Sequence, residues 1–230
     1  MIGVFDSGVG GLCALNELHR LMPGENLVYF ADRKNAPYGN KSPEEIVEFC
    51  QNSIAFLAGL GARRVLIACC TASTMHDLIK KELSEISLPI ISPTAHFTSE
   101  SRRILVIATE HTAKMGAFKK EIAKFSPAIV IEKAVQRLVS LVECGCRDRH
   151  INEECKNILY EIKGDCEREN IDTLILGCTH FSHLENELSK LLPDVKIINP
   201  AHIGARTMAK MMTEKYENGK IQYIESQVRV

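Results

Sequence analysis

The stretch VLIACCT at residues 65–71 decides the fold, and TLILGCT at residues 173–179 matches it. In both stretches an unbroken apolar run leads into cysteine and then threonine. A run that is apolar throughout is typical of a parallel β-strand with both faces buried. The two stretches therefore predict two buried strands that each end beside a cysteine.

Two further pairs of stretches repeat in the same order along the chain. IGVFDSG (2–8) resembles ILVIATE (104–110), and PIISPTA (89–95) resembles VKIINPA (195–201). One such pair can arise by chance among apolar strands, but three pairs in one order favour an internal duplication. We therefore predict an α/β fold with two similar domains, each a parallel sheet flanked by helices, and an active site in the cleft between them.

Helical patterns lie between the predicted strands. Ser42, Pro43 and Glu45 form a helix start with an N-cap, a first-turn proline and a capping-box glutamate. The predicted strands are Ile2–Phe5, Leu27–Phe30, Val65–Ala68, Pro89–Ile91, Ile104–Ala108, Ala128–Glu132, Thr173–Leu176 and Val195–Ile198.

The predicted first domain comprises residues 1–97 plus 206–230, and the second comprises residues 98–205. We expect the tail to return to the first domain through a helix at Gly204–Tyr216 and a strand at Ile221–Ile224.

The composition is that of an ordinary globular protein. The 230 residues are 45% hydrophobic and 25% charged, with a net charge of −1, so nothing marks the chain as a binder of nucleic acid or membrane surfaces. No apolar run approaches the roughly 20 residues of a membrane span, and the N-terminal stretch does not read as a signal peptide. We expect a cytoplasmic protein, whose nine cysteines are reduced, with a small-molecule substrate.

Four polar loops follow predicted strands. Ligands of open parallel sheets bind beyond the carboxyl ends of the strands, so two facing domains would bring these loops together across a cleft. The loops are Asp6–Gly8, Cys69–Thr71, Thr109–Thr112 and Cys178–His180.

Cys69 and Cys178 carry the strongest chemical signal. Each precedes a predicted helix, whose N-terminal dipole is expected to lower the thiol pKa from about 8.5. One such cysteine suggests a nucleophile, but two facing each other suit the inversion of a stereocentre. One thiolate removes a proton from one face of the carbon, and the opposite thiol returns a proton to the other face. The loop N–H groups and hydroxyls can stabilise the negative charge that develops.

Five motifs resemble those of glutamate racemase, in the aspartate/glutamate racemase family: IGVFDSGVGGL (2–12), PYGNKS (37–42), ACCTAS (68–73), LVE (141–143) and LILGCTHF (174–181). The resemblance implies interconversion of L- and D-glutamate without a cofactor or metal, in a homodimer that supplies D-glutamate for peptidoglycan synthesis. It implies that Cys69 and Cys178 are the acid/base pair, that Asp6 assists the first thiol and His180 the second, and that Glu143 supports His180. The substrate-binding positions it implies are Asp6, Ser7, Tyr38, Gly39, Cys70, Thr71, Thr179 and His180.

The chain departs from the family pattern at several positions. Cys70 replaces an asparagine that normally helps to hold the substrate's amino-acid head group, and a thiol is a weak hydrogen-bonding partner. Gln136 and Ser140 occupy positions where the family has proline, and Ser182 and His183 follow CTHF in place of PL. A residue-by-residue match of the two strand-end stretches also pairs Cys178 with Cys70, whereas the family pattern pairs it with Cys69.

Other interpretations of the sequence remain. The chain could be a racemase for aspartate or another amino acid, a hydrolase that uses one cysteine through an acyl-enzyme, or a binding protein without activity. The turn at residues 6–11 lacks the pattern of a phosphate-binding loop. The spacing of Cys144, Cys146, His150 and Cys155 is not that of a zinc site, and we predict no metal.

Overall fold

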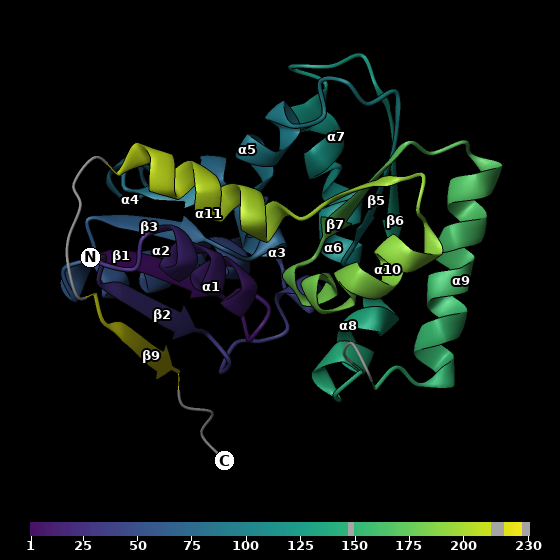
Figure 1. Cartoon of the computed structure of the whole chain (residues 1–230). Helices are drawn as coiled ribbons and strands as arrows, with labels where there is room; N and C mark the ends of the chain where they lie inside the picture. The colour runs from purple at the N-terminus through teal and green to yellow at the C-terminus, as the bar shows by residue number, and fades with distance from the viewer. Residues whose placement is uncertain (147–149, 213–218, 227–230) are drawn as a thin grey trace.

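The computed structural model describes residues 1–146, 150–212 and 219–226. Two parallel β-sheets lie side by side, and helices cover both, as Figure 1 shows. The predicted fold class is confirmed.

The first sheet has the strand order β4-β3-β1-β2-β9, and every neighbouring pair is parallel. The second sheet has the order β6-β5-β7-β8 and is also parallel throughout. The strands are β1 (Ile2–Asp6), β2 (Leu27–Ala31), β3 (Arg64–Ile67), β4 (Ser87–Pro89), β5 (Arg103–Ala108), β6 (Ile129–Ala134), β7 (Thr173–Gly177), β8 (Lys196–Ile198) and β9 (Ile221–Glu225).

Both sheets share one topology. In each, the first strand lies between the second and the third, and the fourth lies outside the third. The repeated stretches supply the first and third strands of each sheet, and the last pair of stretches coincides with the end of β4 and with β8, which agrees with an internal duplication. The winding reverses between β1 and β3 and again between β5 and β7, and such switch points are where ligands of open sheets bind. The predicted domain boundaries stay a prediction.

The helices connect the strands and cover the sheets. Helix α2 begins as expected, because Ser42 Oγ accepts the N–H of Glu45 and the Glu45 carboxylate accepts the N–H of Ser42. The α-helices are α1 (Leu12–Leu21), α2 (Pro43–Gly59), α3 (Cys70–Ser73), α4 (Lys81–Ser84), α5 (Ile91–His96), α6 (Glu110–Met115), α7 (Ala117–Ile122), α8 (Gln136–Glu143), α9 (Glu153–Arg168), α10 (Glu185–Leu191) and α11 (Pro200–Met211). The 3-10 helices are η1 (Tyr38–Asn40), η2 (His76–Leu78) and η3 (Thr179–Leu184).

The central strands form the core. All five residues of β1 and all five of β7 are buried. Helix α11 follows the last strand of the second sheet but packs on α1 and α5, so it ties the two halves together (Figure 1). Strand β9 pairs with β2, which brings the tail back to the first sheet as expected.

Most predicted strands agree with the structure to within one or two residues at each end, but one predicted strand and one predicted helix need correction. The strand predicted at Pro89–Ile91 is wrong beyond Pro89, because Ile91 already begins α5 and Ser73 Oγ accepts the N–H of Ile90. An apolar run of this length does not distinguish a strand end from the start of a buried helix. The helix predicted at Gly204–Tyr216 begins earlier, at Pro200, where Asn199 caps it. Its predicted end lies outside the described residues.

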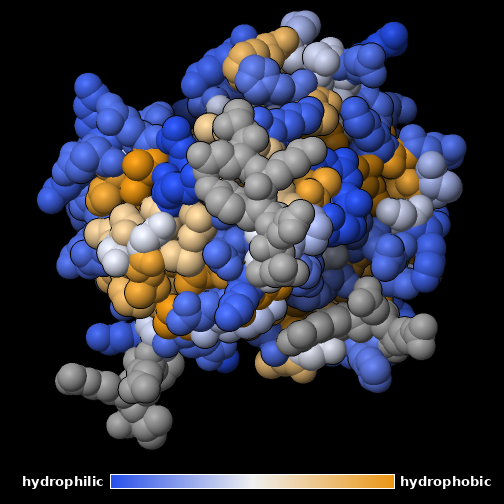
Figure 2. Space-filling view, turned by 60° about the vertical axis from the view of Figure 1, so that its left-hand side comes forward, coloured by the Kyte–Doolittle hydropathy of each residue, from blue (hydrophilic) through white to orange (hydrophobic). Residues whose placement is uncertain are grey.

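The surface is mainly polar on the face that Figure 2 draws. Hydrophilic side chains cover most of the face in Figure 2, with hydrophobic residues gathered in patches among them. No helix in the described part of the chain is long and apolar enough to cross a membrane. The homodimer stays a prediction.

Candidate active site

The carboxyl ends of the two sheets meet at one small cavity. Cys69 follows β3 and Cys178 follows β7, and both cysteines line the cavity although they belong to different sheets. The lining residues are Ser7, Ala36, Pro37, Tyr38, Gly39, Cys69, Cys70, Thr71, Thr109, Gln136, Val139, Glu143, Cys178, Thr179 and His180. Every predicted site residue except Asp6 is in this lining, and Asp6 is buried beside it.

The cavity volume is about 20 Å³. A single water needs roughly 10–15 Å³ on the same measure, so an amino acid does not fit in this conformation. Substrate entry therefore requires the two sheets or their loops to move apart. A wider cavity of about 530 Å³ lies between η2, β4 and α7, but no cysteine is among its described lining residues.

Cys69 is buried and holds few polar contacts. Its Sγ lies 3.5 Å from Ser7 Oγ and accepts the N–H of Ala72 at 3.5 Å. The pKa of Cys69 is raised to about 12, chiefly by burial and also by the negative charge of Asp6, although the contacts with Ala72 and Ser7 oppose the rise. The expected lowering of this pKa is wrong, because α3 is only four residues long and its N-terminus does not outweigh desolvation.

Cys178 has a different electrostatic environment. Its Sγ lies 3.6 Å from Nδ1 of His180, and His180 Nε2 forms an ion pair with Glu143 Oε1 at 3.1 Å. Burial alone lowers the pKa of His180, but Cys178, Glu143 and Asp6 together raise it well above its usual value. His180 in turn lowers the pKa of Glu143. The three side chains therefore form a connected chain in which His180 lies between Cys178 and Glu143.

Asp6 joins the two halves of the site. It is fully buried at the end of β1, where Oδ1 accepts the N–H of Gly8 at 2.7 Å and Oδ2 accepts the hydroxyl of Thr179 at 3.1 Å. Burial raises its pKa, and the charge of His180 opposes that rise. Asp6 thus makes a direct hydrogen bond with Thr179, the neighbour of Cys178, and its charge raises the pKa of Cys69.

The predicted substrate-binding residues are held by partners that the sequence did not reveal. The Tyr38 hydroxyl donates to Asp32 Oδ2 at 2.6 Å, which fixes the Tyr38-Gly39 turn over the cavity. Thr71 Oγ1 lies 3.0 Å from Thr109 Oγ1 and 3.2 Å from Thr112 Oγ1, so hydroxyls from both sheets meet there. The polar loop after β5 was a signal for these threonines, whereas Asp32 had none.

Cys70 lies beside Cys69 in the lining and is 1% exposed. Its side chain also packs into the apolar core under β1 and α11. The position therefore still faces the site, but it brings no strong hydrogen-bonding group where the resemblance implies an amide. Among the described residues, no group of three or more His, Cys, Asp and Glu side chains is arranged to hold a metal.

Comparison with known proteins decides the family. The model of the family described as "Asp/Glu/Hydantoin racemase" matches residues 13–208. The chain belongs to this racemase family. It is 36% identical over 205 residues to a glutamate racemase of Picosynechococcus sp. The aligned residues cover 87% of this chain and 72% of the relative.

Solved structures of the racemase family agree. Glutamate racemase from Francisella tularensis, solved in complex with D-glutamate, superposes with a TM-score of 0.86 at 28% identity, covering all of this chain and 89% of that one. The isoform RacE1 from Bacillus anthracis gives a TM-score of 0.85 at 29% identity, with coverage of 99% and 88%. The two-sheet architecture around the cavity is therefore that of this family of isomerases.

The fit between the two halves of this racemase depends on a glycine. A Cβ at Gly10 would lie 2.5 Å from Thr179 Oγ1 and 2.9 Å from the backbone nitrogen of His180. We expect Gly10→Ala to displace the Cys178 loop and to lower kcat/KM by about a hundredfold, since small misplacements of catalytic groups cost about that much. The contrasting variant is Gly59→Ala, where a Cβ meets nothing within 4 Å. Steady-state kinetics of both variants measures the effect. Equal kcat/KM values for the two variants would contradict the prediction.

Proposed function

We propose that this chain interconverts L- and D-glutamate by moving the α-proton between the substrate and two thiols, Cys69 and Cys178, without a cofactor. The observation that supports it most is that two thiols from two similar parallel sheets line one cavity. One thiol on each side of a carbon is what inversion requires, because the proton leaves from one face and another arrives at the opposite face.

The two thiols have different surroundings. Cys69 keeps its proton at neutral pH because its pKa is about 12, whereas His180, whose pKa is raised well above its usual value, lies 3.6 Å from the sulfur of Cys178. In the proposed mechanism Cys178 is the base for the enantiomer whose α-proton faces it. Cys178 takes that proton, and Cys69 gives its own proton to the other face of the α-carbon.

The reverse reaction starts from the protonation states that the forward reaction leaves on the two thiols. After one turnover in this direction Cys69 is a thiolate, and its high pKa makes it a strong base. That strength suits the α-proton of an amino acid, which is very weakly acidic. The charge on His180 and the N–H groups of the surrounding loops stabilise the negative charge that develops on the substrate. Asp6 and Glu143 keep His180 protonated.

Glutamate is the proposed substrate because the relatives that match most of the chain are glutamate racemases, one of them solved with D-glutamate. Supply of D-glutamate for peptidoglycan synthesis is part of the same proposal, because the resemblance implies it. The cytoplasmic location stays a prediction. The aspartate racemase of Picrophilus torridus shares the fold at 16% identity. Aspartate is therefore the competitor to exclude.

Incubation of the reduced protein with L-glutamate in D₂O tests the proposal, with L-aspartate in parallel. We expect the circular dichroism signal of glutamate to decay to zero while its α-proton signal disappears from the NMR spectrum. Decay with aspartate alone would move the proposal to that substrate. Binding of glutamate without exchange of the α-proton would identify a binding protein and would refute the racemase.

Cys70 provides a further prediction. We expect Cys70→Asn to preserve the kcat/KM for glutamate or to raise it by up to about tenfold, because the amide adds hydrogen bonds to a charged group at a position that lines the cavity. The control is Cys144→Asn, because Cys144 is exposed and does not line the cavity. Cys50→Asn is unsuitable as a control, because Cys50 is buried and an asparagine there would disturb the core. A large loss of activity in Cys70→Asn alone would show that the pocket needs the thiol.

A further inference from the structure

Gln136 enters the cavity from a position where the family has proline. It is the first residue of α8, directly after β6, and its side chain reaches the cavity beside Gly39. A Cβ on Gly39 would lie 3.0 Å from Gln136 Oε1 and 3.4 Å from Nε2. The amide therefore packs closely against the predicted substrate-binding turn from the other sheet.

The orientation of this amide is set by one hydrogen bond. Gln136 Oε1 accepts the backbone N–H of Glu110 at 3.2 Å, so the oxygen faces α6. The Nε2 group carries two N–H donors, and no group among the described residues accepts a hydrogen bond from them. Gln136 thus combines an anchored oxygen with a donor group at the cavity.

The rest of the described lining offers few partners for a carboxylate. It contains no lysine or arginine, and its one basic side chain, His180, is committed to Cys178 and Glu143. A dicarboxylic amino acid needs neutral donors in such a site. Cys70 has lost the amide that the family supplies from the first sheet, and Gln136 places an amide in the same cavity from the second.

We infer that Gln136 is a substrate-binding residue of this chain, whose Nε2 donates a hydrogen bond to a carboxylate of the amino-acid substrate. The amide takes over part of the role of the missing asparagine at position 70. This inference rests on the proposed function, since it names a binding group for the same substrate. It involves no proton transfer, so the chemistry of the two thiols is unchanged.

Gln136→Glu is the decisive variant. It keeps the oxygen that accepts the Glu110 N–H but replaces the donor by a negative charge facing the substrate carboxylate. We expect KM for glutamate to rise at least about tenfold with a smaller change in kcat, because a hydrogen bond to a charged group is lost and repulsion replaces it. A purely structural role at Glu110 predicts wild-type KM for this variant and a loss only in Gln136→Ala.

The matched control is Arg137→Ala, the next residue on α8. Arg137 is exposed, pairs with Glu154 and does not line the cavity, so its removal is expected to leave KM unchanged. We also expect Cys70→Asn to restore at least part of the affinity lost in Gln136→Ala, since it returns an amide to the cavity. Additive effects of these two changes would contradict the shared role.

Calorimetric titration with L-glutamate separates this inference from the proposed function. If the wild type binds glutamate without racemising it, the proposed function fails, and a tenfold weaker affinity of Gln136→Glu still supports the inference. If the wild type racemises glutamate and Gln136→Glu binds it equally well, the inference is wrong while the proposed function stands. If the wild type acts on aspartate instead, a tenfold weaker affinity of Gln136→Glu for aspartate supports the inference, and an equal affinity refutes it. Absence of binding by the wild type refutes both.

Discussion

Cys69→Ser and Cys178→Ser are each expected to lower the racemisation rate of glutamate by about a thousandfold or more. A serine hydroxyl is far less acidic than a thiol, so it neither holds a usable negative charge nor returns a proton readily. General acid–base catalysis by one group contributes roughly 10²–10⁴-fold, and each substitution removes an acid in one direction and a base in the other. Circular dichroism of either enantiomer measures the loss.

The two serine variants should differ in isotope exchange. In D₂O each variant keeps one thiol, which can still exchange the α-proton of the enantiomer that presents its proton to that side. We expect Cys69→Ser to exchange one enantiomer slowly and Cys178→Ser the other. Exposed Cys144→Ser serves as the control and should be fully active. Normal turnover by Cys178→Ser would exclude the two-base mechanism and revive a mechanism with one cysteine.

His180→Gln is expected to lower kcat by about a hundredfold or more, with the larger effect on the enantiomer that uses Cys178 as base. Glutamine can hydrogen-bond to the sulfur of Cys178 but cannot carry the positive charge that His180 places beside it. His183→Gln is the control, because His183 lies in the same 3-10 helix outside the lining. Equal losses for both enantiomers would indicate a general packing effect.

The effect of His180→Gln on the Tm is expected to depend on pH. The pKa of His180 in the folded protein lies well above its usual value of 6.5. Its protonation therefore stabilises the fold fully below pH 6.5, and this contribution is lost as the pH rises through the raised pKa. The difference in Tm between the wild type and His180→Gln should shrink as the pH increases above neutral. A difference that grows with pH would contradict a charged His180.

The fold was predictable because its signals are local. Unbroken apolar runs identify buried parallel strands, and the N-cap of α2 depends on residues three apart. The bounds were less predictable where an apolar run passes from β4 into α5, since burial rather than periodicity governs both elements. The order of strands and the pairing of β9 with β2 depend on contacts between distant residues, and for these the repeated stretches were the main guide.

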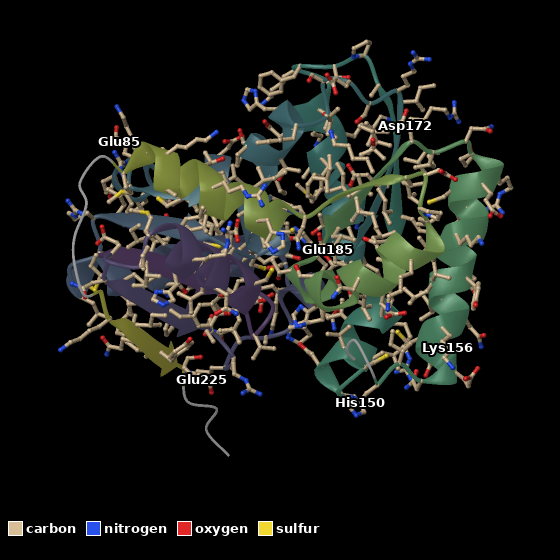
Figure 3. All side chains as sticks on the ribbon, in the orientation of Figure 1. Glu85, His150, Lys156, Asp172, Glu185 and Glu225 are labelled. Carbon is tan, nitrogen blue, oxygen red and sulfur yellow. The ribbon has the colours of Figure 1, made fainter. Side chains whose placement is uncertain are left out.

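Several side-chain contacts join segments that no local sequence pattern links. Glu185, the first residue of α10 and near the middle of the view in Figure 3, accepts a hydrogen bond at 2.6 Å from Nδ2 of Asn199, the N-cap of α11. Cys13 in α1 lies 3.0 Å from His202 Nε2 in α11 at the same junction. No spacing in the sequence indicates these pairs, and Cys13 and His202 belong to different halves of the chain.

The sequence by itself determined which chemistry is present: two cysteines at strand ends, each beside threonine, in a duplicated α/β pattern. Residue type and position at a strand end are local properties, so they can be identified from the sequence. Only the tertiary structure decided the protonation of these groups. The high pKa of Cys69 comes from burial, and the charge of His180 comes from Cys178, Glu143 and Asp6, which three separate segments contribute. Desolvation and charge pairing depend on distances across the cavity, so no motif carries them.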